Sequence, residues 1–95
     1  MPVMSHTIAV HPGAVLADEL EERGIAPSAL AAHIGAMSKT VNEICRGKRG
    51  ISAELAVKLS LALGASSQFW LNLQKNWELS QVNRRAMRRI KPIAA

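Results

Sequence analysis

Cysteine, long apolar runs and catalytic side-chain groupings are all scarce in this sequence. Its single cysteine among 95 residues cannot form an internal disulfide, which many small secreted domains need for stability. No apolar run approaches the roughly 20 residues that cross a bilayer, and the first residues lack a signal-peptide pattern. The sequence also lacks a nucleophile beside a base, paired carboxylates and a metal-ligand spacing of His and Cys. We therefore expect a cytoplasmic protein without membrane contact, catalytic residues, metal or cofactor.

Charge is unevenly distributed along the chain. The formal net charge is +5, from 12 Lys and Arg against 7 Asp and Glu. Residues 1–35 hold one basic and four acidic residues, residues 36–78 hold six and three, and residues 79–95 hold five basic residues and no acidic one. Apolar residues make up 48%, which fits a compact core. We expect one domain with an acidic front, a mildly basic middle and a strongly basic end.

Proline and glycine divide the sequence into helical segments. Pro12 and Pro27 suit the first turn of a helix, and Gly24, Gly35 and Gly64 suit the position after the last turn. Apolar residues between them recur at helical spacing, and no alternating strand pattern of useful length is present. The sequence predicts an all-α domain with five helices. The first four run from Pro12 to Gly24, from about Pro27 to Gly35, from about Ser38 to Arg46, and between Ser52 and Gly64, and the fifth is capped by Ser66 or Ser67 and carries Phe69, Trp70, Leu73 and Trp77. We divide the chain into an irregular lead-in (1–10), this domain (11–79) and a basic tail (80–95).

The second and third predicted helices form a helix-turn-helix pattern around Gly35. With Ala31, Val41 and Ile44 turned inward, the polar residues of the third helix must face outward. Such a surface suits DNA, because side chains of this kind can read base edges or hold phosphates. We expect Lys39 and Asn42 to reach bases, Thr40 and Arg46 to hold phosphates, Glu43 to accept from a cytosine amino group or lie away from the duplex, and Lys48 and Arg49 to contact the backbone. The full predicted DNA-binding set is Ser28, Ser38, Lys39, Thr40, Asn42, Glu43, Arg46, Lys48 and Arg49. An ordinary solvated helix and loop would show a similar pattern.

The three aromatic residues cluster in the fifth predicted helix. Trp is enriched where proteins bind one another, and Trp70 and Trp77 lie seven residues apart on one helix face. We expect Phe69 and at least one Trp in the core, and one indole at a partner. The predicted dimer or partner interface is Trp70, Leu73, Gln74 and Trp77.

Several motifs together resemble the HigA family of antitoxins, over about residues 11–79. These are His11-Pro12-Gly13, Leu30-Ala31, Thr40-Val41-Asn42, Gly47-Lys48-Arg49-Gly50-Ile51-Ser52 and Phe69-Trp70-Leu71-Asn72-Leu73-Gln74. The resemblance implies a phage-repressor-like helix-turn-helix fold with a dimerising fifth helix. It also implies a homodimer that represses its own operon by binding double-stranded operator DNA, and that neutralises a cognate RelE-like, mRNA-cleaving toxin. The alternatives are a stand-alone regulator without a toxin partner, and an antitoxin that has lost DNA contact.

The sequence departs from the family pattern at two helix starts. Ser or Thr often caps both helices of the motif, whereas Ala26 and Met37 stand there in this chain. A lost side-chain cap costs on the order of 1 kcal/mol. If Ser38 capped the third helix instead, the helix would shift by one residue and change which side chain reaches a base.

Two charged segments have open roles at this point. The four acidic residues of the first helix form either a solvated face or a surface for a basic toxin. The arginine-rich tail could continue the fifth helix near DNA phosphates, dock on the rest of the dimer against the acidic first helix, or remain a solvated end.

Overall fold

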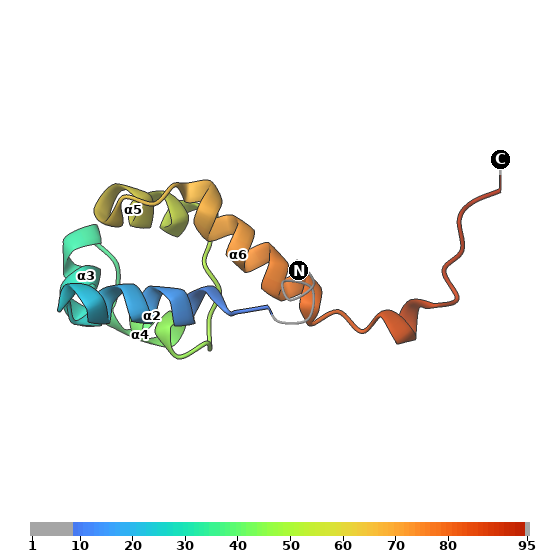
Figure 1. The fold of residues 1–95 in the computed structure, drawn as a ribbon, viewed down its shortest axis with the longest axis horizontal. Coiled ribbons are helices and arrows are strands. Elements are labelled where there is room, and N and C mark those ends of the chain that lie inside the picture. Colours follow the sequence, from blue (N-terminus) through green and yellow to red (C-terminus); the bar gives the residue numbers. More distant parts are fainter. Residues whose placement is uncertain (1–8, 95) are drawn as a thin grey trace.

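The computed structural model describes residues 9–94, which form five α-helices and one 3-10 helix (Figure 1). In chain order these are α2 (Pro12–Arg23), α3 (Pro27–Ile34), α4 (Ser38–Cys45), α5 (Ala53–Leu63), α6 (Ser67–Ser80) and η1 (Arg84–Met87). The all-α, five-helix prediction is confirmed. Most of the predicted lead-in lies outside the described residues. None of the described helices is long and apolar enough to span a membrane.

Helix ends coincide with the predicted proline and glycine positions. Gly24, Gly35 and Gly64 all take positive φ values of 69–96° after their helices, where a side chain would be strained. Ser52 and Ser66 cap α5 and α6, because each hydroxyl accepts a hydrogen bond from a first-turn amide. The short connections follow from these local signals.

One continuous core joins the five α-helices. α3 packs on α4, α5 packs on α6 and α3, and α2 lies against α4 and α6. Trp70, Ile44 and Leu59 are almost fully buried, and burial of an apolar side chain of this size contributes roughly 1.5–3 kcal/mol. The buried hydrophobic residues are Leu16, Leu20, Leu30, Ala31, Val41, Ile44, Ile51, Leu55, Ala56, Leu59, Leu63 and Trp70.

The first turn of α2 lies very close to the last turn of α4. Gly13 is buried, and a Cβ placed on it would overlap the carbonyl oxygen of Ile44. Gly13 lies within α2 and has a helical backbone, so glycine is required here because a side chain would not fit between α2 and α4. This contact fixes α4 against α2.

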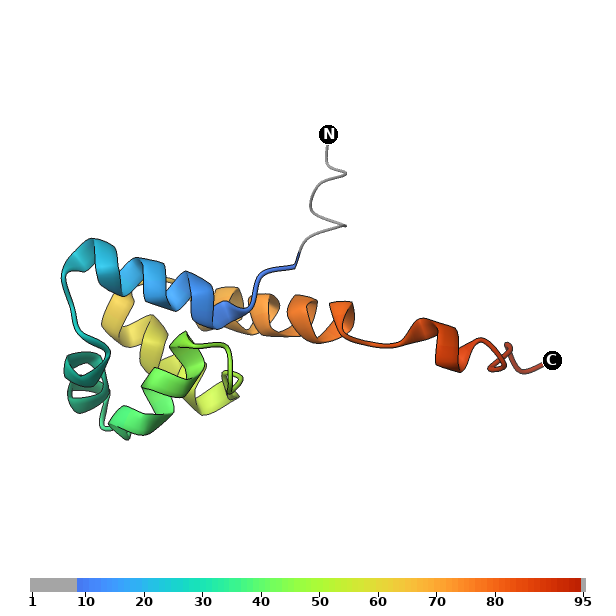
Figure 2. The same cartoon turned by 90° about the horizontal axis from the view of Figure 1, so that it is seen from below.

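The last segment extends beyond the helical domain. α6 projects from the domain, and residues 81–94 continue in the same direction with η1 midway (Figures 1 and 2). All of these residues are exposed. The molecule consequently measures 53 × 30 × 22 Å along its principal axes. The tail neither continues α6 as an α-helix nor lies against α2 of its own chain.

Candidate nucleic-acid interface

The register of α4 is set by Met37, which stands at the N-cap position. Its side chain makes no capping hydrogen bond, and Ser38 is the first helical residue. The alternative in which Ser38 caps α4 is therefore wrong. α3 likewise starts without a side-chain cap, at Ala26, but has Pro27 in its first turn. Both helices of the motif keep the lengths that the sequence predicts to within one residue.

The outward face of α4 carries the predicted polar residues. Val41 and Ile44 are buried beneath them, as predicted. Thr40 and Glu43 are half-buried, at the edge of this face. The predicted DNA-binding residues that are exposed are Ser28, Ser38, Lys39, Asn42, Arg46, Lys48 and Arg49.

Asn42 is held along its own helix. Its Nδ2 donates to the Ser38 carbonyl oxygen at 3.1 Å and lies 3.4 Å from the Ser38 hydroxyl oxygen. These residues are one helical turn apart, so the amide lies flat on the α4 surface.

Glu43 anchors the loop that follows α4, residues 46–52, which we call the basic loop. Its carboxylate accepts a hydrogen bond from Arg49 Nε at 2.9 Å and lies 2.8 Å from Arg49 Nη2. The Lys48 amide also donates to the Glu43 carbonyl oxygen at 2.8 Å. Glu43 therefore holds the loop against the helix, which explains how a carboxylate fits within a basic surface. In the described residues no acidic side chain forms an ion pair with Lys39, Arg46 or Lys48.

Gln74 fixes the end of the same loop from α6. Its Oε1 accepts from the Ile51 amide at 2.8 Å, and its Nε2 donates to Glu78 at 2.9 Å. Gly50 leaves room for this side chain, since a Cβ there would lie 2.8–3.0 Å from the Gln74 amide group. Hydrogen bonds from Gln74 and Lys75 lower the pKa of Glu78. The sequence does not indicate this bridge, although Gln74 lies four residues after Trp70 on the same helix face.

His11 closes the opposite side of the loop. Its Nδ1 accepts from the Gly13 amide at 2.8 Å and thus caps α2. Its ring meets Trp77 edge-on, with centroids 4.7 Å apart. Burial lowers the pKa of His11, which favours the neutral ring that can accept at Nδ1. His11 therefore links α2 to α6 beside the basic loop.

The structure corrects part of the predicted partner surface. Trp70 and Gln74 are 1% and 7% exposed and are enclosed by their own chain, so their assignment to a partner surface is wrong. Leu73 and Trp77 are half-buried. Phe69, expected in the core, is 42% exposed and packs edge-on against Trp70. The face of α6 that carries Trp70 and Gln74 is turned toward α5 and the basic loop.

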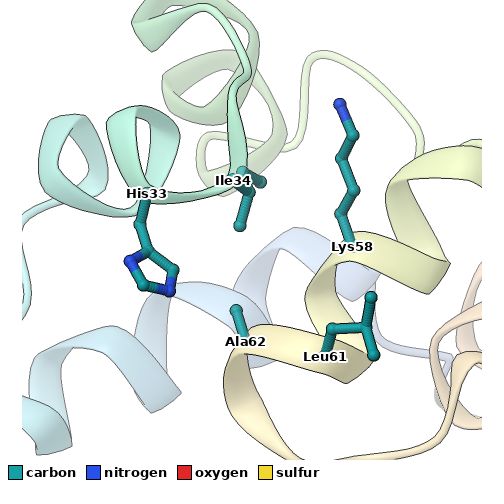
Figure 3. Close-up of a pocket in the computed structure, with 5 residues that line it drawn as sticks. All are labelled: His33, Ile34, Lys58, Leu61 and Ala62. Carbon is teal, nitrogen blue, oxygen red and sulfur yellow. The ribbon is translucent and has the colours of Figure 1, made fainter.

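A shallow groove of about 220 Å³ separates α3 from α5. Figure 3 shows His33 and Ile34 on one side and Leu61 and Ala62 on the other, with the Lys58 ammonium pointing away. These residues provide no nucleophile-and-base pair. Within the described part of the chain, no cluster of three or more His, Cys, Asp or Glu residues is placed to hold a metal ion. Burial raises the pKa of Cys45, so its thiol is not activated.

Known proteins resemble this chain over nearly its whole length, although no family model matches it. The Pseudomonas aeruginosa antitoxin HigA, solved with the higBA promoter, is 38% identical with a TM-score of 0.82, and the match covers 92% of this chain and 100% of that one. Antitoxin GraA in complex with its operator is 34% identical with a TM-score of 0.82, covering 94% and 95%.

Sequence comparison gives a similar match to a further protein. Virulence-associated protein I of Dichelobacter nodosus is 39% identical over 72 residues, which is 75% of this chain and 67% of that protein. The predicted motifs, the five-helix fold and these matches agree. The chain belongs to the HigA family of helix-turn-helix antitoxins.

Proposed function

We propose that this protein is a cytoplasmic, homodimeric antitoxin that represses its own operon and neutralises a RelE-like, mRNA-cleaving toxin. The observation that carries the proposal is the match, over 92% of this chain and at 38% identity, to an antitoxin solved with the higBA promoter. The exposed polar face of α4 and the basic loop behind it supply the chemistry that such an interface needs. Repression and neutralisation both follow from binding, with no covalent step in this chain.

In this proposal α4 enters the major groove of operator DNA. Lys39 reads guanine from the first turn, and Asn42 reads adenine after releasing Ser38. Thr40, Arg46, Lys48 and Ser28 of α3 hold phosphates and set the register. Arg49 exchanges Glu43 for a phosphate or remains the anchor of the loop. A homodimer presents two such helices about 34 Å apart, in successive major grooves of a palindrome.

Lys39→Ala tests base reading. We expect it to weaken binding to the promoter fragment upstream of its own gene by about 1–3 kcal/mol, with a much smaller loss on a scrambled duplex. Lys48→Ala is the matched control, because it removes one exposed positive charge from a position expected to touch phosphate. It should weaken both duplexes similarly and lower the salt slope by about 0.9. Equal losses on both duplexes for Lys39→Ala, measured by fluorescence anisotropy, would contradict the assignment.

The toxin partner is expected to be basic. Asp18, Glu21 and Glu22 project from α2 into solvent, and their charges complement such a protein. Expression of a small adjacent open reading frame should be toxic alone and harmless together with this chain. Absence of such a gene would favour the stand-alone regulator.

The homodimer is tested by light scattering at micromolar concentration, which should give the mass of a dimer. The mass of a monomer would contradict the binding of two α4 helices to the two halves of a palindrome.

A further inference from the structure

The formal charge of the molecule is concentrated in one short segment. Residues 1–80 hold seven basic and seven acidic residues and are therefore neutral overall. The whole excess of +5 lies in residues 84–91, which we call the basic arm. Its charged residues are Arg84, Arg85, Arg88, Arg89 and Lys91. Long-range attraction of this chain to a polyanion therefore depends mainly on the basic arm.

Within residues 9–94, no acidic side chain pairs with a charge of the basic arm. All four ion pairs among the described residues lie elsewhere, and every arm residue is exposed. The arm begins with the short helix η1, which Asn83 caps because its Oδ1 accepts a hydrogen bond from the Ala86 amide at 3.2 Å. Like charges held this closely repel one another, and an anionic partner would relieve that repulsion.

The basic arm starts at the end of the domain where the basic loop lies. A Cβ at Gly47 would be 4.0 Å from the His11 ring, and that ring packs on Trp77 in the last turns of α6. α6 ends at Ser80, and the arm leaves from there (Figure 2). Seven residue steps of roughly 2–3.3 Å each give the arm a reach of about 20 Å. This reach exceeds half a turn of duplex, so an arm that leaves this end of the domain is long enough to meet phosphates beyond those nearest Lys48.

We propose that the basic arm binds the phosphodiester backbone of duplex DNA next to the stretch that α4 contacts. This inference rests on the proposed function, because α4 brings the duplex to the domain. The arm reads no sequence: its guanidinium groups pair with phosphates and release counterions, which adds affinity on every duplex. The folded domain supplies sequence choice and the arm supplies general attraction.

Two double variants of equal charge provide the test. Arg88→Gln with Arg89→Gln removes two charges from the basic arm. Lys58→Gln with Lys75→Gln removes two charges from α5 and α6, where both lysines already form ion pairs with Glu54 and Glu78. Binding of the full chain is measured by anisotropy between 50 and 300 mM salt, on the promoter fragment and on a scrambled duplex, at about neutral pH.

The arm variant should lower the salt slope by about 1.8, at about 0.9 per lost phosphate contact, and weaken both duplexes about tenfold at low salt. The α5/α6 variant should leave the slope unchanged. Because the arm is exposed, thermal unfolding should match the unaltered protein.

Two results would overturn the proposal. Equal slopes for the two variants would show that the arm is a solvated end. An unchanged slope with weakened dimerisation would assign the arm to the acidic α2 of a second copy instead. The unaltered protein tests the proposed function separately. If that function is wrong, the unaltered protein should bind the promoter fragment and the scrambled duplex equally well. The salt slope on the scrambled duplex would still test the arm.

Discussion

Substitution of Gly13 by alanine sets two known effects against each other. In an ordinary helix the change stabilises, because alanine is favoured over glycine by about 0.5–1 kcal/mol. At this position the new Cβ would overlap the Ile44 carbonyl oxygen and lie 2.7 Å from its carbon, where ordinary contacts begin at 3.4 Å. Both groups belong to helix backbones and cannot rotate away. α2 and α4 must then separate, and overpacking of this kind typically costs 1–3 kcal/mol or more.

The cost of the steric overlap should exceed the gain in helix propensity. Gly13→Ala should therefore destabilise the fold by about 2 kcal/mol, or roughly 8–16 °C in Tm. Urea unfolding followed by the fluorescence of Trp70 and Trp77 measures this at fixed protein concentration. Ala14→Gly is the matched control: it lies one residue later, is exposed, and reports the propensity effect alone. A Gly13→Ala protein as stable as the unaltered one would refute the close approach of α2 and α4.

Two further predictions concern the groups around the basic loop. Gln74→Leu should cost about 1–3 kcal/mol in unfolding free energy, because the buried Ile51 amide loses its acceptor; an unchanged urea midpoint would contradict the bridge. Burial lowers the pKa of His11 below its ordinary value of 6.5, so the unfolded chain takes up the proton first and stability should fall as pH drops through about 6.5. His11→Asn can still cap α2 and should flatten the change in urea midpoint between pH 7.5 and 5.5, whereas an equal change in both proteins would exclude His11 as its source.

The sequence predicted the helix boundaries because their causes are local. A proline fixes its own φ, and a glycine tolerates the left-handed conformation, so Pro27 and Gly35 mark the limits of α3 without reference to the rest of the fold. The exposed face of α4 followed equally directly from the inward positions Val41 and Ile44. These parts of the candidate interface could be predicted from the helical spacing of residues within α4 alone.

The orientation of α6 was not accessible in the same way. Phe69 and Trp70 are neighbours of similar hydrophobicity, and only packing against α5 decides which one enters the core. Gln74 is polar, so the sequence predicts a surface position. It can be buried because its Oε1 accepts a hydrogen bond from the amide of Ile51, 23 residues earlier. The pairing of Glu43 with Arg49 likewise depends on how the loop folds back. Such long-range partners are absent from any local pattern.

The hydrogen bond between Ile51 and Gln74 also bears on how the molecule opens. The Ile51 amide lies outside any helix, so its exchange with solvent deuterium would normally be fast. Here a side chain from α6 accepts the hydrogen bond of that amide, and its proton can exchange only when the Gln74 side chain and the loop come apart. The exchange rate at this one residue therefore measures the free energy of opening this contact, separately from global unfolding.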